Sequence, residues 1–237
     1  MILPALIRHH LRHKDDAEFY RLQAADAIRW IAESGVRLGP ETQALDLGAG
    51  HGVFGAELLK AGCRVTFSDE QNYLLPELGH HPFVPFNIDR QTLGELGRYD
   101  LVICSNVLEH LARPEHLLYS IQDCLNPGGY FYLSWTNWLS PWGGHEFSPF
   151  HYLGPRFGPK LWDRIKGVPR KHTPYENLFP TSISRTLRLL KQNRAVRLVR
   201  LAPRYYTEFA FLCRVPVLRE FLTWNCAMLL RRTPDIS

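Results

Sequence analysis

The chain has 237 residues, of which 45% are hydrophobic and 22% are charged, and its formal net charge is +5. This composition is ordinary for a globular domain, and it excludes a disordered chain, a collagen-like repeat and a low-complexity segment as descriptions of the whole. At this length we expect one domain over residues 1–237, large enough to bury its own core.

The cysteines and the N-terminal residues indicate in which cellular compartment the protein works. Five cysteines are scattered without a C-x-x-C pair, which favours free thiols in a reducing compartment over a disulfide framework. No apolar run reaches the roughly 18 residues of a membrane-spanning helix. The apolar residues 1–7 precede their basic cluster, which is the reverse of a signal peptide. We therefore expect a cytoplasmic protein.

The charge is divided unevenly along the chain. Residues 1–150 carry 11 Lys and Arg against 18 Asp and Glu, a net charge of −7, and residues 151–237 carry 17 against 5, a net charge of +12. The basic part is either a solvated face or a surface that meets an anion. Residues 204–232 mix arginine with aromatic residues and leucine, as interfacial helices do, which suggests peripheral contact with a membrane.

Periodicity predicts an alternation of strands and helices after an N-terminal helical cap of residues 1–39. Strands and helices that alternate at this spacing predict an α/β domain with a parallel sheet covered on both faces. Residues 136–180 lose the periodicity and are rich in Trp, Gly, Pro and His. The expected helices are 14–34, 53–61, 114–125, 182–193 and 215–223, and the expected strands are 44–47, 64–68, 83–87, 101–105, 130–135 and 195–201. A last apolar run covers 225–230.

A glycine-rich turn follows the first predicted strand. The sequence Asp46-x-Gly48-x-Gly50-x-Gly52 ends this strand and opens a helix, and its glycines permit a positive-φ path on which a ligand can pack. Ligands of doubly wound sheets bind at this edge. Asp69 ends the next strand, where a carboxylate can accept both hydroxyls of a ribose. The turn and Asp69 together predict a nucleoside or nucleotide site.

Two ligands compete for this turn. Residues 50–55 match the dinucleotide fingerprint G-x-G-x-x-G, with Asp69 near the spacing of its ribose contact. Pyrophosphate binding does not demand Asp46 or Gly48, however. A carboxylate at residue 46 suits a positively charged ligand, such as the amino and sulfonium groups of S-adenosylmethionine. An NAD(P)-dependent oxidoreductase is the least favoured alternative.

Four motifs in order resemble those of class I S-adenosylmethionine-dependent methyltransferases of the small-molecule type. The resemblance implies a Rossmann-like, seven-stranded, mostly parallel sheet with an aromatic-rich insertion or lid at 136–180, after strand five. It also implies S-adenosyl-L-methionine as cofactor and S-adenosyl-L-homocysteine as product. The motifs are LDLGAGHG at 45–52, the strand-end Asp69, YDLVICSNVLEHL at 99–111 and LNPGGYFYLS at 125–134.

The resemblance also assigns roles to individual residues. Asp69 holds the ribose, Asp89 lies beside the adenine amino group, and a helix at the N-terminus covers the cofactor. Phe19 and Tyr20 would make that cover, unless they only pack their own helix. The residues expected at the methionine end of the cofactor are Asp46, Gly48, Ala49, Gly50, Ser105 and Asn106.

Methyl transfer from a sulfonium is an in-line displacement that depends on near-attack geometry. A hydroxyl or amine acceptor also loses a proton, commonly to a histidine. The candidates are His145 and His151 in the insertion and His110 after the fourth strand, and the alternative for each is a loop hydrogen bond. No His, Cys or Asp spacing predicts a metal site.

We expect O-methylation of a small-molecule acceptor, anionic or hydrophobic. Methylation of RNA or another macromolecule, and a non-catalytic cofactor-binding module, stay open. Nucleic acid is disfavoured because residues 105–108 read Ser-Asn-Val-Leu where base-methylating enzymes usually carry Asn/Asp-Pro-Pro-Tyr. The dense aromatic residues of the insertion either wall the acceptor pocket or pack the insertion on the sheet. The expected acceptor contacts are Trp138, Trp142, Glu146, Arg204 and Tyr205.

Overall fold

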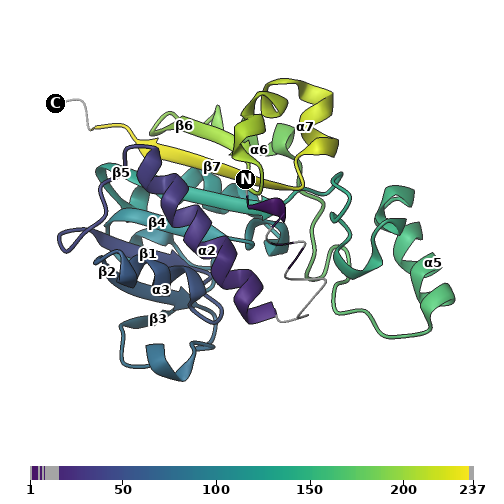
Figure 1. Cartoon of the computed structure of the whole chain (residues 1–237), viewed down its shortest axis with the longest axis horizontal. Coiled ribbons are helices and arrows are strands. Elements are labelled where there is room, and N and C mark those ends of the chain that lie inside the picture. The colour runs from purple at the N-terminus through teal and green to yellow at the C-terminus, as the bar shows by residue number, and fades with distance from the viewer. Residues whose placement is uncertain (1, 5, 7, 9–15, 235–237) are drawn as a thin grey trace.

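The computed structural model describes residues 2–4, 6, 8 and 16–234 (Figure 1). Seven strands form one sheet in the order β3-β2-β1-β4-β5-β7-β6. All neighbours pair in parallel except β7, which is antiparallel to β5 and β6. This confirms the expected Rossmann-like, mostly parallel sheet. The strands are β1 (Gln43–Leu47), β2 (Arg64–Asp69), β3 (Phe83–Pro85), β4 (Tyr99–Ser105), β5 (Leu125–Thr136), β6 (Val196–Pro203) and β7 (Asn225–Arg232).

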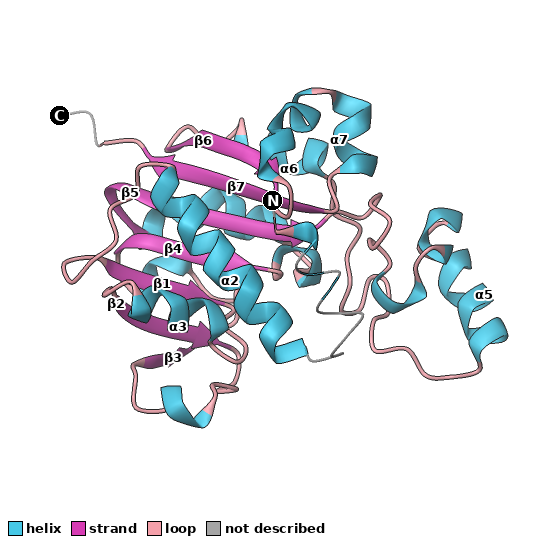
Figure 2. Cartoon of the chain, in the orientation of Figure 1, coloured by secondary structure: helices cyan, strands magenta, loops and turns pink. Residues whose placement is uncertain are grey.

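Helices lie on both faces of the sheet (Figure 2). One face packs against α2 and α3, and the other packs against α4 and α6. The α5 helix stands apart, beyond the edge where the parallel strands end (Figure 1). The helices are α2 (Asp16–Glu33), α3 (Val53–Lys60), α4 (Pro114–Ser120), α5 (Phe157–Lys166), α6 (Ile183–Leu190) and α7 (Pro216–Leu222).

The central strands show why two apolar cores form. Side chains of a strand alternate between faces, so Leu45 and Leu47 join the core under α4, while Ala44 joins the core under α2 and α3. Asp46 shares the second face, in a strand whose other residues after Gln43 are all buried and apolar. A carboxylate placed there must find a partner within the protein.

The order of the strands positions the site. The chain runs outward from β1 through β2 to β3 and then returns to β4 on the other side of β1. Such a switch point leaves a crevice at the carboxyl ends of the strands. The glycine turn after β1 and the ends of β2 and β4 meet at this edge, and α2 begins beside it (Figure 1).

Residues 136–180 are more regular than the sequence predicts. The expected irregular stretch contains α5 as well as short 3-10 turns. Gly158 and Pro159 lie in the first turn of α5, where proline is tolerated because the amide has no intrahelical partner. These two residues obscured the helix in the sequence. The segment has a small core of its own, made of Trp138, Phe147, Trp162 and Leu178.

Three other boundaries differ from the prediction. The helix expected over 114–125 leaves α-helical geometry after Ser120 and continues as a 3-10 turn. β5 begins at Leu125, ahead of the strand expected over 130–135, and its pairing with β4 shifts register there. A 3-10 segment, Thr207–Arg214, precedes α7 in a stretch where the sequence predicts no helix.

Candidate functional site

The glycine turn takes the path that its glycines permit. Gly48 and Gly50 have φ values of 74° and 51°, in the left-handed region that favours glycine. A Cβ on Gly48 would lie 2.5 Å from a methyl group of Val107, whereas a Cβ on Gly50 would meet no atom within 4 Å. Gly48 therefore allows close packing against the segment after β4, and Gly50 faces open space where a ligand can lie on the backbone.

Asp69 ties the end of β2 to this turn. Its Oδ2 accepts a hydrogen bond from the Gly50 amide at 2.8 Å, and its Oδ1 accepts one from the Glu70 amide at 2.7 Å. A carboxylate has about four lone-pair positions in all. Asp69 can therefore hold the turn and still accept hydroxyl groups of a ligand.

Asp46 holds the turn from beneath. Its buried Oδ2 accepts a hydrogen bond from the Gly55 amide in the first turn of α3, at 2.8 Å. Burial raises the pKa of Asp46 to about 7, and the nearby charge of Asp69 adds to the rise. A positively charged ligand beside Asp46 would favour its ionised form.

The segment after β4 faces the same edge. Asn106 has a φ of 56°, and its amide donates to the Ser134 carbonyl at 2.8 Å. Its side-chain Oδ1 accepts hydrogen bonds from Arg204 Nη1 at 3.1 Å and from Asn225 Nδ2 at 3.0 Å. The hydroxyls of Ser105 and Ser134 lie 2.8 Å apart. The two predicted residues of this segment are thus fixed by bonds to neighbouring strands.

Arg204 is a buried cation with unused donors. Its side chain is 3% exposed, stacks over the rings of Phe54 and Tyr205, and bonds Asn106, yet its Nε and Nη2 are buried without a partner. Buried donors that make no hydrogen bond carry a desolvation cost. An anionic group would supply the missing acceptors.

Tyr205, the other predicted acceptor contact at this end of β6, is tied to the N-terminal residues. Its carbonyl accepts hydrogen bonds from the amides of Ile2 and Leu3.

A cleft of about 640 Å³ opens next to the end of β2 and the segments after β3 and β4. Asp89 is one of the residues that line it. The carboxylate of Asp89 accepts hydrogen bonds from the amides of Ala112 at 3.0 Å and Arg113 at 2.8 Å, so it fixes the start of α4. The volume is in the range of small-molecule sites. The cleft is lined by residues after β2, β3 and β4 and by the end of the insertion: Glu70, Asn87, Asp89, Arg90, His110, Ala112, Arg113, His172, Glu176, Asn177 and Phe179.

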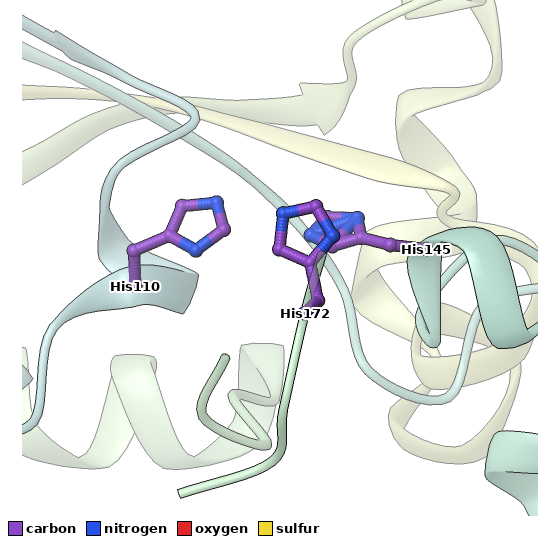
Figure 3. A group of neighbouring side chains, drawn as sticks. All are labelled: His110, His145 and His172. Carbon is purple, nitrogen blue, oxygen red and sulfur yellow. The ribbon is translucent and has the colours of Figure 1, made fainter. Parts of the chain in front are cut away.

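Three histidines from distant segments meet beside this cleft (Figure 3). His110 follows β4, His145 lies in the first part of the insertion and His172 near its end. One ring nitrogen of each lies within 4.8 Å of one ring nitrogen of the other two. The sequence predicts His110 and His145 as candidate bases, but neither His172 nor the cluster. No local spacing could reveal it, because the three residues are joined only by the fold.

Two of these rings are oriented by hydrogen bonds at Nδ1. His110 Nδ1 lies 2.6 Å from the Asn177 carbonyl oxygen, and His172 Nδ1 lies 2.5 Å from Glu146 Oε2. Glu146 Oε1 also accepts the amides of Lys171 and His172, both at 2.7 Å. Glu146, predicted as an acceptor contact, therefore anchors the segment that carries His172.

His145 occupies the most constrained position of the three. Its φ of 49° is unusual for a residue with a side chain. Its Nε2 is buried and has no hydrogen-bond partner. Burial, together with the neighbouring His172 and His110, lowers the pKa of His145 to about 4. The ring is therefore neutral near pH 7.

His151 and Trp138 lie inside the insertion. His151 is buried, its Nε2 is 2.9 Å from the Ser140 carbonyl oxygen, and it packs edge-on against Trp138. Trp142, in contrast, is 59% exposed and stacks on Trp224 with ring centroids 5.3 Å apart. The aromatic residues of the insertion thus divide between its own core and its surface.

The start of α2 carries the two residues expected to cover the cofactor. Phe19 is half-buried and Tyr20 is exposed, and their rings meet edge to face with centroids 6.0 Å apart. Both lie at the end of α2 that is next to the carboxyl edge of the sheet (Figure 1).

The chain is similar to proteins named as methyltransferases. A family described as "Methyltransferase domain" matches residues 17–170. An uncharacterized methyltransferase of Mycobacterium bovis is 34% identical over 228 residues, which cover 92% of this chain and 89% of that protein. One from Mycobacterium tuberculosis is 33% identical over 227 residues, with the same shares covered.

Solved structures share the fold. An S-adenosylmethionine-dependent methyltransferase from Mesorhizobium loti has a TM-score of 0.59 at 19% identity, over 87% of this chain and 98% of that chain. Magnesium protoporphyrin IX methyltransferase from Synechocystis, solved with S-adenosylhomocysteine bound, has a TM-score of 0.54 at 15% identity, over 90% of this chain and 83% of that chain.

Proposed function

Because the chain belongs to the methyltransferase-domain family, whose members take the methyl group from S-adenosylmethionine, we propose that it O-methylates a small-molecule acceptor. One observation supports the place in the molecule that we propose for the acceptor. Glu70 and Asp89, near the expected adenosyl group, line the same cleft as His110 and His172. A donor held by the first pair and an acceptor held by the second would meet within one cavity.

The cofactor lies, in this proposal, across the ends of β1, β2 and β4. The open space over Gly50 and the remaining acceptor capacity of Asp69 support a ribose at this point. The buried carboxylate of Asp46 supports a positively charged methionine end above it. Phe19 and Tyr20 at the start of α2 would cover the bound cofactor.

A proton acceptor is needed when a hydroxyl is methylated. The buried, unpartnered Nε2 of His145 supports this residue as the base, with His110 beside it. His151 is a weaker candidate, because it lies in the core of the insertion and bonds a carbonyl. The exposure of Trp142 supports this residue as an acceptor contact, whereas Trp138 supports the loop that carries His145.

The acceptor carries a negative charge in this proposal. The two unpartnered donors of buried Arg204, next to Tyr205 and to Asn106 at the end of β4, support an anionic group there. A carboxylate or phosphate would satisfy both donors, and arginine binds such groups in a fork geometry.

An exposed apolar surface supports contact with a membrane or a hydrophobic acceptor. No helix in residues 2–4, 6, 8 and 16–234 is long and apolar enough to span a bilayer. Arg214 is exposed among the apolar residues, and the C-terminal part is strongly basic. Both features fit an anionic lipid surface. The apolar residues are Phe209, Phe211, Val215, Val217, Leu218, Phe221 and Leu222.

Sedimentation with anionic vesicles tests this contact. The chain should pellet with phosphatidylserine vesicles at low salt, and a Phe211→Ser, Leu218→Ser variant should not. Tyr73→Ser, which removes an exposed aromatic ring elsewhere, is the matched control. Equal sedimentation of all three proteins would contradict a role for this surface.

The five cysteines are free and buried. This supports the further proposal that the protein works in a reducing compartment, the cytoplasm. Fractionation of cells that produce it should recover the protein with cytoplasmic markers, and recovery with an exported fraction would contradict the proposal.

The methylation proposal is tested with S-adenosylmethionine labelled in its methyl group. Cell extract filtered to retain only small molecules serves as the source of acceptors. The proposal predicts label in a small molecule, as a methyl ether or ester by mass spectrometry. Label in RNA or protein after the extract is replaced by those fractions would contradict it.

A further inference from the structure

We propose that His110, His145 and His172 together bind one divalent transition-metal ion of the Zn²⁺ type, with an open coordination position toward the cleft. The inference deepens the proposed function and rests on it only for the position of the acceptor. The binding of the ion itself depends on the three side chains and their neighbours (Figure 3).

The hydrogen bonds at Nδ1 decide which nitrogens can bind a cation. The Glu146 carboxylate and the Asn177 carbonyl can only accept, so His172 and His110 must each donate Nδ1–H to them. In a neutral imidazole this leaves Nε2 with its lone pair. The unpartnered Nε2 of His145 is buried close to both rings. A cation between the three rings would satisfy all of these nitrogens.

Glu146 and Asn177 act as the outer partners that metal-binding histidines have in proteins. A ligating histidine almost always donates its second ring nitrogen to a carboxylate or a carbonyl, which fixes the tautomer and raises the basicity of the ligand. Glu146 does so for His172 at 2.5 Å, and the Asn177 carbonyl does so for His110 at 2.6 Å. Two of the three rings are thus already oriented as ligands.

The separation of the rings is wider than in a loaded site. A tetrahedral Zn²⁺ ion with Zn–N bonds of about 2.0–2.1 Å holds its nitrogen ligands roughly 3.3 Å apart. One ring nitrogen of each histidine lies within 4.8 Å of one ring nitrogen of the other two, so the rings must move inward on binding. All three residues lie in 3-10 turns or loops rather than within the sheet, where such an adjustment needs no change in strand pairing.

The donor set indicates the kind of ion. Three neutral imidazoles suit zinc, copper, iron and nickel rather than magnesium or calcium, which prefer oxygen. Three protein ligands with one open position are the arrangement of catalytic rather than structural zinc. His110 and His172 line the cleft, so the fourth position opens to the space proposed for the acceptor.

The ion would then take the place of a histidine base. An acceptor hydroxyl that binds the ion loses its proton to solvent more readily, because the cation stabilises the negative oxygen. That oxygen attacks the methyl carbon of S-adenosylmethionine. The new C–O bond forms as the C–S bond breaks, and S-adenosylhomocysteine leaves as a neutral thioether.

Titration with Co²⁺ tests the site without requiring the acceptor. The chain is prepared without a histidine tag, stripped with a chelator and titrated with Co²⁺, and visible absorption and bound metal are measured. We expect one equivalent of Co²⁺, intense bands of a four-coordinate ion, and displacement by Zn²⁺. The bands should be lost in His172→Ala and in His145→Asn, a variant chosen because asparagine tolerates positive φ. Glu146→Gln should weaken binding about 10–100-fold.

His80→Ala is the matched control. His80 is exposed, and its ring lies 4.1 Å from that of His81. The substitution therefore removes one member of a histidine pair that does not line the cleft. This variant should bind Co²⁺ like the wild type. Less than half an equivalent in the wild type, or equal loss in His80→Ala and His172→Ala, would overturn the inference.

Titration of each variant with S-adenosylhomocysteine verifies folding and separates the two proposals. Binding of S-adenosylhomocysteine without binding of Co²⁺ overturns the metal site alone. Binding of Co²⁺ without binding of S-adenosylhomocysteine supports the metal site and overturns the proposed methyl transfer.

Discussion

The turn over residues 46–55 and the segment over residues 135–151 lie at the same edge of the sheet and are built in opposite ways. In the turn, buried Asp46 bonds an amide nine residues away, and no buried side-chain nitrogen or oxygen atom lacks a partner. In the segment over residues 135–151, five buried side-chain nitrogen or oxygen atoms have no hydrogen-bond partner, including His145 Nε2 and His151 Nδ1.

The turn is therefore a preformed site, whereas the segment over residues 135–151 keeps buried polar atoms that lack a hydrogen-bond partner. The turn is held by its own backbone and by carboxylates, so it needs no ligand to keep its shape. Buried polar atoms without partners are costly, and they are retained where a ligand, an ion or water completes them. We infer that the turn supplies binding of the cofactor and that the insertion supplies the chemistry of the acceptor.

The largest effect is expected from Asp69→Ala, which acts on the turn. The variant loses the bond to the Gly50 amide and the expected acceptor of the ribose. Each hydrogen bond to a charged group contributes about 1.5–3 kcal/mol, so affinity for S-adenosylhomocysteine should fall about 100-fold or more. Calorimetric titration measures this. Glu41→Ala, which removes an exposed carboxylate, should change nothing.

The reverse test acts on the insertion. His145→Asn should reduce turnover about 100-fold or more, the usual contribution of a group that assists proton removal. It should leave affinity for S-adenosylhomocysteine within about twofold, because the two regions act separately. Initial rates with an identified acceptor and parallel titrations measure both quantities. A large loss of cofactor affinity in this variant would break the comparison.

The two regions also differ in how far the sequence predicts them. The turn is local: a strand, three glycines and Asp69 lie within 27 residues from Gln43 to Asp69, so the sequence alone predicts a nucleoside or nucleotide site there. The histidine cluster is assembled from residues 110, 145 and 172, and no periodicity connects them. His172 and the role of Glu146 therefore could not be predicted, nor could the bonds that Asp89 makes to the start of α4.

Two glycines of the turn should respond differently to alanine. Gly48→Ala forces a Cβ against Val107 at a positive φ and should lower the free energy of unfolding by about 1–3 kcal/mol. Gly50→Ala meets no protein atom, so only the cost of a positive φ remains, about 1 kcal/mol. Its affinity for S-adenosylhomocysteine should fall about tenfold if the cofactor packs there. Urea unfolding and calorimetry distinguish the two, and equal effects on binding would contradict an open Gly50.

The smallest effect concerns pH. The pKa of Asp46 rises from 3.8 to about 7, so the folded chain keeps a proton that the unfolded chain releases. The stability contributed by this proton is full below pH 3.8 and is lost as the pH rises to about 7. S-adenosylmethionine carries one more positive charge than S-adenosylhomocysteine. The ratio of the affinity for S-adenosylmethionine to that for S-adenosylhomocysteine should therefore rise about fivefold between pH 6 and pH 8, as Asp46 ionises.

Asp46→Asn is the control for this dependence. Asparagine can still accept the Gly55 amide but has no charge to gain. The ratio of the two affinities should then be independent of pH. A ratio that stays constant in the wild type would show that Asp46 does not face the charged end of the cofactor.

A crystal structure with S-adenosylhomocysteine bound tests whether the turn and the histidine cluster serve one reaction. We expect the ribose hydroxyls within hydrogen-bond distance of Asp69, the methionine end above Asp46 and Gly50, and the sulfur turned toward the cleft lined by His110 and His172. A ligand bound at this edge with its sulfur turned away from the three histidines, or bound elsewhere on the chain, would contradict this expectation.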